Sequence, residues 1–380
     1  MKVLILTTSY PRNSADPSGI FIKRLAGSLI RKGVKVTVLA PGDSQAKSHE
    51  WEEGIEIVRF FYAPRRLMKI AYGEGGIPEN LRRSPWLFSL LPLFLISLIS
   101  YTIILARNCD VIHANWLQLG FLALPAKVIH RKPLVVTIRG SDFKKGLTWL
   151  GYLVFNYVEA ITTVNQQWYH QLRGLWGTKV FYTPDGVEIG DKVIDPRTRF
   201  NISRDKIVVL YVGALRWIKG ADFLFQIAKS TGKINPSIQF LIIGPGNPKE
   251  FGLDKLPNVI CAGSLPPQEV LAIFPGCDIF IFPTRHEGRG IVFLEAMASG
   301  LPCVASNLPV IAEVLTSEAG ILIEVGRIKE FVEAIDKLAK DSSRRKTMGE
   351  KARLRINELA LDWDTCAYHF WQIFNKLTSQ

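Results

Sequence analysis

The stretch FPTRHEGRGIVFLEAMASG, residues 282–300, shows the unit from which the chain is built. A β-branched, apolar run leads into it from 278 to 282, a loop with Gly288 and Gly290 follows, and a helical pattern begins near Gly290. A strand that passes through a glycine-bearing loop directly into a helix is typical of doubly wound α/β domains. The stretch therefore predicts a parallel sheet with helices on its faces.

Apolar runs of the same kind recur in two series, and helical segments separate most of them. Near-continuous apolar strands alternating with helices indicate parallel sheets that are covered on both sides. The first series has candidate strands at 3–7, 35–39, 55–60, 111–114, 134–138, 160–164 and 179–182, and the second has them at 207–212, 239–243, 259–261, 278–282, 303–305 and 321–323. A chain of 380 residues also has the length of two domains. We therefore expect two doubly wound domains in tandem.

The segment TPDGVEIG, residues 183–190, is rich in turn residues and lies between the two series. We interpret it as the hinge, with an N-terminal domain at 1–185 and a C-terminal domain that starts at 186. Ligands of doubly wound sheets bind at the carboxyl ends of the strands. The sequence therefore predicts a substrate site in the cleft between the domains.

The positive charge of the chain is concentrated in its first half. Of the net charge of +13, residues 1–185 carry 23 Lys and Arg against 12 Asp and Glu, and the remainder carries 24 against 22. This asymmetry indicates an anionic partner for the first half, either a membrane surface or an acidic acceptor. No recognition-helix, zinc-finger or RNA-binding signature accompanies the charge, so we expect no nucleic-acid partner.

Cysteine usage and the first residues favour a cytoplasmic protein. The five cysteines are scattered and form no C-x-x-C pair, as expected of free thiols in a reducing compartment. The apolar run at residues 3–8 is too short for a secretory signal and fits a first buried strand. We expect a cytoplasmic location, with peripheral contact to the inner face of the cell membrane as an open addition.

Residues 84–106 carry no charge and are flanked by arginines at 82, 83 and 107. By length the segment could span a bilayer. A span would place the strands before and after it on opposite sides of the membrane, and Pro92 interrupts the helix, so we do not expect one. Two interpretations stay open: helices packed on the first domain, or an in-plane membrane contact. The basic rim of such a contact would be formed by Arg65, Arg66, Lys69, Arg82 and Arg83.

The loop and helix start at 287–292 form the candidate donor site. Free backbone N–H groups and the positive end of the helix dipole at Gly290 suit a diphosphate, with Gly288, Ile291 and Val292 beside it. Glu287 precedes the turn and Glu295 lies about one and a half turns inside the helix. Because a carboxylate can accept two hydroxyl protons, one would bind a sugar hydroxyl and the other a ribose diol.

This stretch resembles the signature of the family 4 retaining glycosyltransferases, and the resemblance covers nearly the whole chain. Further segments that carry it are PSGI at 17–20, DVIHANW at 110–116, VTIRGSD at 136–142, PDGV at 184–187 and VGALRWIKG at 212–220. The residues from Asp362-Trp363 onward resemble the family's segment that crosses back onto the first domain, here as a helix at 363–380 that leaves 186–362 as the second domain.

The resemblance implies the GT-B fold, in which two Rossmann-like domains face a central cleft. The first domain would bind the acceptor and the second the nucleotide-sugar donor. The implied reaction moves a sugar, with retention, from a nucleotide-diphosphate sugar to a glycan or lipid-linked acceptor. Synthesis of a cell-envelope polysaccharide or glycolipid would be its setting.

On the donor side, Lys219 follows the strand at 207–212 and opens a helix. A lysine there can neutralise the diphosphate as the leaving group gains charge. The family usually carries an arginine directly after Gly213, where this chain has Ala214, so we suggest that Arg216 replaces it; a plain surface charge is the alternative. Gly244 ends another strand and either shapes the donor pocket or makes a simple turn.

On the acceptor side, the family often has a histidine where this chain has Arg139. Arginine cannot act as a general base, because its pKa exceeds about 12. In the mechanism that the resemblance implies, the departing phosphate accepts the proton, so Arg139 would instead bind a phosphate or carboxylate. A salt bridge with Asp142 is the alternative role.

Four more residues complete the acceptor side, and one of them is predicted with an alternative. Gly19 would let the backbone approach a ligand at a helix start. Asn115 and Trp116 follow a strand and would line the acceptor. His113 has the same placement, but a core histidine is an equal alternative.

We expect no metal ion and no cofactor, only the nucleotide sugar as co-substrate. Asp362-Trp363-Asp364 formally matches a metal-binding D-x-D motif, but aspartate at a helix start is better explained as a cap. Two alternative functions stay open: a non-catalytic sugar-nucleotide-binding protein of this fold, and a sugar-nucleotide epimerase.

Overall fold

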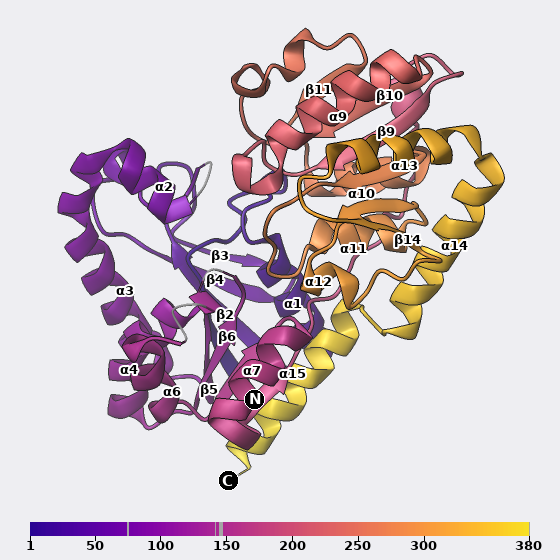
Figure 1. Cartoon of the computed structure of the whole chain (residues 1–380). Coiled ribbons are helices and arrows are strands. Elements are labelled where there is room, and N and C mark those ends of the chain that lie inside the picture. The colour runs from indigo at the N-terminus through magenta and orange to yellow at the C-terminus, as the bar shows by residue number, and fades with distance from the viewer. Residues whose placement is uncertain (74–75, 141, 144–146, 380) are drawn as a thin grey trace. The chain divides into compact units, whose positions relative to one another are not determined.

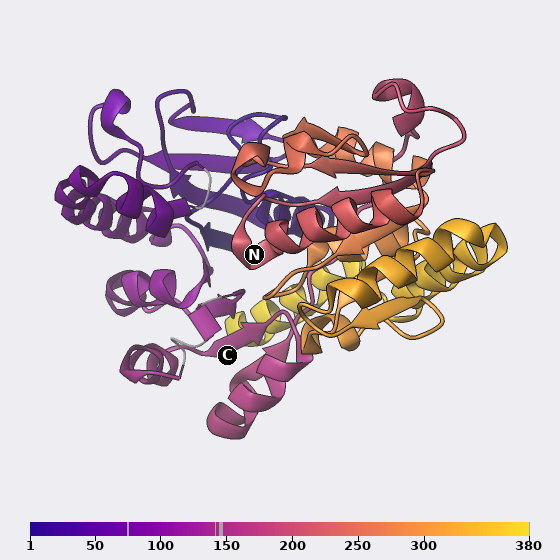
Figure 2. The ribbon, with the colours of Figure 1, turned by 45° about the horizontal axis from the view of Figure 1, so that its top comes forward.

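The computed structural model describes residues 1–73, 76–140, 142–143 and 147–379. The chain forms two compact units, Met1–Asp185 together with Trp363–Gln380, and Gly186–Asp362. Each unit is a sheet with helices on both faces (Figures 1 and 2).

The sheet of the first unit has the strand order β3-β4-β2-β1-β5-β6-β7-β8. All neighbouring strands pair in parallel except β3, which is antiparallel to β4. Every predicted strand of the first series is present, and β3 was not predicted because its sequence HEWE lacks an apolar run. The strands are β1 (Lys2–Leu6), β2 (Lys35–Pro41), β3 (His49–Glu52), β4 (Ile55–Phe60), β5 (Val111–Asn115), β6 (Leu134–Ile138), β7 (Ala160–Thr163) and β8 (Val180–Tyr182).

Side chains that alternate along these strands build two cores, one on each face. In β1, Leu4 and Leu6 belong to one core and Val3 and Ile5 to the other. The first core lies under α2 (Gly76–Arg83), α3 (Leu91–Ala106), α4 (Leu117–His130), α6 (Trp149–Tyr157) and α7 (Gln166–Trp176), with short 3-10 turns η1 (Arg65–Leu67), η2 (Pro85–Leu90) and η3 (Gly177–Lys179). The second core lies under α1 (Ile20–Arg31) and α15 (Trp363–Thr378).

The C-terminal helix α15 belongs to the first unit, although the whole second unit precedes it in the chain. It packs along α1 and places Phe370 and Phe374 in the core of that face. An ion pair of 2.8 Å between Arg31 on α1 and Asp364 in the first turn of α15 joins the two helices at the surface.

The second unit repeats the same topology without counterparts of the two edge strands β3 and β8. Its strands follow the order β11-β10-β9-β12-β13-β14, all in parallel: β9 (Ile207–Val212), β10 (Ile238–Ile243), β11 (Val259–Gly263), β12 (Ile279–Phe282), β13 (Cys303–Ser306) and β14 (Gly320–Ile323). Its helices are α8 (Pro196–Arg199), α9 (Ala221–Ile234), α10 (Pro267–Ile273), α11 (Ile291–Ala298), α12 (Pro309–Ala312), α13 (Ile328–Lys340) and α14 (Ser342–Glu358), with 3-10 turns η4 (Trp217–Lys219), η5 (Pro248–Phe251), η6 (Leu253–Lys255) and η7 (Phe274–Gly276).

Both sheets reverse their winding direction at one point, between β1 and β5 in the first unit and between β9 and β12 in the second. Beyond the carboxyl ends of the strands, such a reversal leaves a crevice in which doubly wound proteins bind ligands. The site residues predicted from the sequence follow these strands and their neighbours.

The apolar segment 84–106 forms η2 and α3. Its two ends lead from β4 and into β5, which belong to one sheet, so the segment does not cross a membrane. Helix α3 packs on the first unit, because it lies against α4 and buries Phe94, Leu98 and Ala106 in the core, and this packing is compatible with both interpretations of the segment. Among the described residues, the segment Pro85–Ala106 is nevertheless long and apolar enough to span a membrane.

We predict that Phe370→Ala destabilises the first unit by about 3–5 kcal/mol, because removal of a buried ring leaves a cavity. Phe370 is fully buried and packs against the rings of His113 and Phe374. Tryptophan fluorescence during urea unfolding measures this unit, since eight of the nine tryptophans lie in it and only Trp217 does not.

Tyr368→Ala is the matched control, because Tyr368 lies on the same helix and is 45% exposed. This substitution should lower the free energy of unfolding by about 0.5 kcal/mol or less. Equal costs for the two variants would show that α15 is not part of the core.

Candidate active site

Two residues predicted from separate motifs meet in the second unit. Lys219 ends η4 after β9, and Glu287 lies in the loop after β12. Since β9 and β12 are neighbouring strands, their loops emerge at the same edge of the sheet. The Nζ atom of Lys219 lies 2.6 Å from Oε1 of Glu287, and the side chains are 33% and 8% exposed. The pair therefore lies at the winding reversal of this sheet, with the lysine open to solvent.

Backbone contacts hold the two loops together around this pair. Gly220 has φ 75°, and a Cβ atom on it would lie 2.0 Å from the carbonyl oxygen of Pro283. The backbone N–H of Arg285 donates to the carbonyl oxygen of Ile218 at 3.0 Å, and the hydroxyl of Thr284 donates to the same oxygen at 3.2 Å. The separation of Lys219 from Glu287 is thus set by main-chain geometry.

Arg285 is a supporting residue that the sequence analysis missed. Its guanidinium donates to both carboxylate oxygens of Asp222, at 2.6 and 2.7 Å, and lies over the rings of Trp217 and Phe223. These contacts tie the loop after β12 to the first turn of α9. Its place two residues before Glu287 was the only available signal.

The predicted helix start is present at Gly290, which has φ 72° and precedes α11. No described side chain caps this helix, and its first turn holds no acidic residue. Gly288, Ile291 and Val292 are half-buried around it, so the first turn can accept an anion. Glu295 lies on α11 as predicted and is 5% exposed.

The loops after β9 and β10 also lie close together. The backbone N–H of Gly213 donates to the carbonyl oxygen of Ile243, and a Cβ atom on Gly244 would lie 2.1 Å from the carbonyl oxygen of Gly213. The hydroxyl of Tyr211 donates to the carbonyl oxygen of Ala214 at 3.1 Å. In the described part of the chain no carboxylate pairs with Arg216, which is half-buried at the start of η4.

Arg289, between the two glycines of the signature, was also missed. It is 4% exposed and forms an ion pair with Glu313. Its Nε and Nη2 atoms are buried without a hydrogen-bond partner among the described residues. The residue is therefore fixed by one carboxylate on one side only.

In the first unit, Arg139 at the end of β6 is buried in a network of polar groups. Its Nη1 atom donates to both carboxylate oxygens of Asp185, at 2.6 and 2.8 Å, and its Nε donates to Oδ1 of Asn115 at 2.8 Å. The guanidinium lies 4.7 Å from the centre of the Phe21 ring. Nη2 is buried and has no partner in the described residues.

The alternative partner that we considered for Arg139 was wrong. Asp142 instead accepts the backbone N–H groups of Leu117, Arg139 and Gly140, at 3.1, 3.3 and 2.8 Å. Its burial raises the pKa of this carboxyl group. Asp142 therefore holds the loop after β6 against the start of α4. Ser141 of the same motif lies outside the described residues.

Gly19 and Trp116 lie at helix starts, as predicted. Gly19 has φ 67°, and a Cβ atom there would lie 2.0 Å from the carbonyl oxygen of Ser9. Trp116 has the rare φ of 74° and meets the ring of Phe21 edge-on at 6.2 Å. Phe21 contacts both Trp116 and Arg139, so the structure brings the predicted acceptor-side residues Trp116, Asn115 and Arg139 together.

For His113, the structure favours the core alternative. The side chain is fully buried, its Nε2 lies 2.7 Å from the hydroxyl of Thr137, and its ring packs on Phe370. Burial, followed by the charge of Arg139, lowers the pKa of His113 to about 3. The histidine is therefore neutral in the folded protein and does not face an acceptor.

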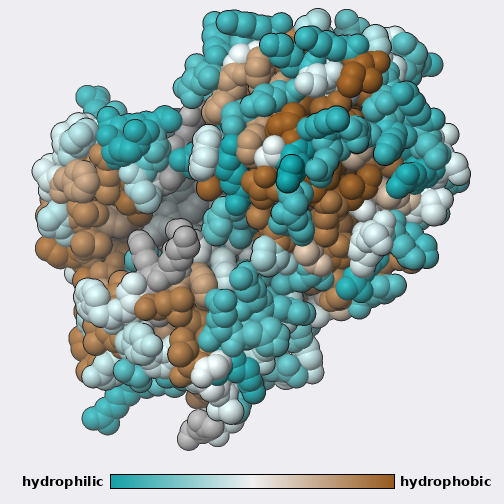
Figure 3. All heavy atoms as spheres, viewed as in Figure 1, coloured by the Kyte–Doolittle hydropathy of each residue, from teal (hydrophilic) through white to brown (hydrophobic). Residues whose placement is uncertain are grey.

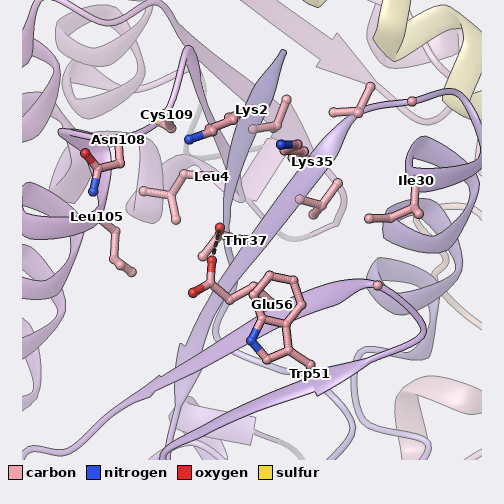
Figure 4. A pocket seen from close by; sticks show the side chains of 15 residues that line it. Lys2, Leu4, Ile30, Lys35, Thr37, Trp51, Glu56, Leu105, Asn108 and Cys109 are labelled. Carbon is pink, nitrogen blue, oxygen red and sulfur yellow. Dashed lines mark hydrogen bonds between the residues drawn. The ribbon is translucent and has the colours of Figure 1, made fainter.

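Two further observations concern other candidate sites. A pocket of about 650 Å³ at the amino ends of β1 and β2 is lined by Lys2, Lys35 and Trp51, with Glu56 accepting from Thr37 at 2.7 Å (Figure 4). It lies at the edge of the sheet opposite the predicted site residues and contains none of them.

Within the described residues, no three His, Cys, Asp or Glu side chains group around a metal position. Asp364 lies in the first turn of α15 and pairs with Arg31.

Comparison with known proteins agrees with this arrangement. Residues 195–355 match the family model of the glycosyl transferases group 1, and residues 18–185 match that of the glycosyl transferase 4-like domain. Together the two matches take in most of both units. The chain belongs to the group 1 glycosyltransferases. The family predicted from the sequence motifs is thereby confirmed.

Similar proteins extend the comparison. CapM, a capsular polysaccharide biosynthesis glycosyltransferase from Staphylococcus aureus, is 30% identical to this glycosyltransferase over 160 residues, or 40% of this chain and 42% of that protein. A sucrose-phosphate synthase from Thermosynechococcus elongatus has a TM-score of 0.79 at 20% identity and covers 100% of this chain and 99% of its own. HepE from Anabaena, solved in complex with UDP-glucose, has a TM-score of 0.74 at 17% identity with full coverage of both chains. These structures confirm the GT-B fold of the glycosyltransferase.

We predict that His113 makes the first unit of the glycosyltransferase sensitive to acid. An unfolded histidine has a pKa of about 6.5, so between that value and about 3 the unfolded chain binds a proton that the folded chain does not. Stability present above pH 6.5 is therefore lost as the pH falls, by about 2 kcal/mol at pH 5.

Replacement His113→Gln removes the titration, and the urea midpoint of tryptophan fluorescence should then fall less between pH 7 and pH 5 than in the wild type. His49→Gln is the control, because that side chain is 53% exposed. The same pH slope in the wild type and His113→Gln would contradict the assignment.

Proposed function

We propose that this glycosyltransferase moves a hexose-type sugar from a nucleoside diphosphate donor to a glycan or lipid-linked acceptor, with retention and without a metal ion or cofactor. The single observation that carries the proposal is the Lys219–Glu287 pair at the winding reversal of the second sheet, beside the start of α11. A cation, a carboxylate and a helix start lie together there. The cation and the helix start can bind the diphosphate of a nucleotide sugar, and the carboxylate can bind its sugar.

Each residue of the second unit has a role in this proposal. The ammonium group of Lys219 has three donors, so it can keep Glu287 and still bind the diphosphate. Its charge then stabilises the nucleoside diphosphate leaving group as the bond between the anomeric carbon and the diphosphate breaks. Glu287 accepts from a sugar hydroxyl and Glu295 from the ribose, while the first turn of α11 and Arg216 bind the phosphates. Gly213 and Gly244 place no side chain at the point where the two neighbouring loops approach each other.

In the first unit we assign two roles to Arg139. It fixes the residues around it, and it binds an anionic group. Its bonds to Asp185 and Asn115 fix the guanidinium, and the buried Nη2 is the atom left for a phosphate or carboxylate. Because arginine stays protonated, the proton of the incoming hydroxyl would pass to the departing phosphate on the same face. Gly19, Trp116 and Asp142 shape this acceptor side.

The setting that we propose is the cytoplasm, with transfer to a cell-envelope polysaccharide or glycolipid. CapM is named for capsular polysaccharide biosynthesis, and HepE was solved with UDP-glucose. Uridine diphosphate sugars are therefore the first donors to test, followed by guanosine and adenosine diphosphate sugars. Two other functions would use the same donor site: binding without catalysis, and epimerisation of the donor sugar.

We predict that Lys219→Ala and Glu287→Ala each reduce sugar transfer by about 10²–10³-fold, the loss expected when one preorganised electrostatic contact to a transition state is removed. Transfer is measured with purified protein and the donor that the wild type uses. Circular dichroism should show that both variants keep their fold.

Lys340→Ala is the matched control. Lys340 also forms a 2.6 Å pair, with Asp336, but on the exposed surface of α13. Its transfer rate should equal that of the wild type. Wild-type rates in Lys219→Ala and Glu287→Ala would show that the site is placed wrongly.

We further predict that a panel of nucleotide sugars reveals one donor that the purified protein slowly hydrolyses and that raises its melting temperature. NMR of the first-formed product should show the donor's anomeric configuration, as retention requires. An inverted product would exclude the retaining mechanism. Binding without hydrolysis or transfer would favour the non-catalytic alternative, and an epimerised donor without acceptor would favour an epimerase.

A further inference from the structure

Helix α3 presents an apolar stripe to solvent. Phe94, Leu98, Thr102 and Ala106 recur every four residues and are buried. The opposite stripe holds Leu93, Ile96 and Ile104, which are 50%, 60% and 65% exposed. Surface helices normally carry charged residues on this stripe, and a helix that is apolar all round is normally covered on every side. Within the described chain, nothing covers the outer stripe of α3.

The same kind of surface continues over the neighbouring elements. Helix α4 packs between α3 and α6. Its residues Val128 and Ile129 are exposed, as are Trp149 and Tyr157 on α6 and Trp86 on η2. We call the solvent-facing sides of η2, α3, α4 and α6 the apolar face. Figure 3 shows hydrophobic side chains along the side of the first unit where Figure 1 places α3, and below it over α4 and α6.

Exposed apolar residues are concentrated on this part of the chain. Of the 24 large hydrophobic side chains that are exposed among the described residues, 14 lie between Leu67 and Tyr157. Contiguous apolar surface of this extent marks an interaction site, whereas single exposed apolar residues do not. The apolar face therefore has the character of an interaction surface.

Charge around the apolar face identifies the partner. The residues of η2, α3 and α6 carry no charge at all. Basic residues follow at the ends: Arg107 after α3 and Arg131 after α4, and near the start of α3 the exposed Arg65 and Arg66. Two contacts of Phe61 place Arg65 near α3. The guanidinium of Arg65 lies over the Phe61 ring, and the hydroxyl of Ser97 on α3 donates to the Phe61 carbonyl oxygen.

An apolar face with basic ends and interfacial aromatics fits the surface of an anionic bilayer. A second copy of the chain fits less well, because a symmetric contact would bring the same basic ends together. Partial insertion also fits the topology, since both ends of the segment return to one sheet.

We infer that the apolar face seats in the headgroup layer of an anionic membrane, with α3 lying in the plane of the bilayer. The buried stripe of α3 stays on the protein core while the outer stripe enters the lipid. The face contains none of the residues assigned to donor binding, so the inference does not depend on the proposed function. A lipid-linked acceptor would meet the first unit at such a surface.

Vesicle flotation tests the inference with the full chain. The protein should float with vesicles of phosphatidylcholine and phosphatidylglycerol at low salt, and less with phosphatidylcholine alone. Salt near 1 M should weaken binding to the anionic vesicles, because it shortens the Debye length to about 3 Å.

Two sets of variants separate the apolar and the basic contributions. Ile96→Asn with Ile104→Asn should reduce the bound fraction at least about tenfold, whereas Ile234→Asn with Leu354→Asn, at 58% and 52% exposed positions of the second unit, should not. Arg65→Gln, Arg66→Gln and Lys69→Gln together should weaken binding to anionic vesicles only, with Arg204→Gln, Lys249→Gln and Lys255→Gln as the control.

Three results would overturn the inference. One is the absence of flotation at low salt. Another is equal binding by the wild type and the α3 variant, provided that both show the same thermal unfolding. The third is a dimer in sedimentation experiments that the α3 variant dissociates while neither protein binds vesicles, which would identify a second copy as the partner.

Discussion

In the second unit, the backbone of Gly220 passes so close to the carbonyl oxygen of Pro283 that no side chain fits between them. This contact joins the loop after β9 to the loop after β12, and the two loops supply Lys219 and Glu287. A side chain at position 220 would push the loops apart and lengthen the ion pair. The donor site that we propose therefore depends on a glycine that supplies no side chain to it. The bidentate bond of Arg285 to Asp222 reinforces the same junction from the outside.

The first unit uses charge where the second uses close packing. Arg139 donates to Asp185, the last residue before the chain enters the second unit, and to Asn115 at the end of β5, so one side chain joins β6, β5 and the segment that leads to the second unit. A buried arginine must be paired with an opposite charge, because an unpaired buried ion costs several kcal/mol. The glycosyltransferases that this chain resembles often carry a histidine at this position. An arginine in its place requires a carboxylate, such as Asp185, within reach. With arginine at this position, the loop carries a fixed positive charge that does not titrate near neutral pH.

Much of the fold could be predicted because it rests on local patterns. Each apolar run of the two series became a strand, and Gly290 became the start of α11, since apolar periodicity and glycine conformations are local properties. Strand β3 was missed because a polar edge strand has no apolar run. The partner of Arg139 could not be predicted, since Asp185 lies 46 residues away and only the fold brings it near. His113 stayed undecided for the same reason, because the helix that buries it begins 250 residues later.

The return of α15 to the first unit has a consequence for how the protein is made. Residues 363–378 leave the ribosome after the whole second unit, yet they complete the core beneath α1. Domains usually fold in the order of synthesis. Here the second unit is contiguous and can fold while one face of the first sheet is still covered only by α1. Until synthesis reaches Phe374, that apolar face is open to chaperones and to other nascent chains, so the unit that is synthesised first is the one that finishes folding last.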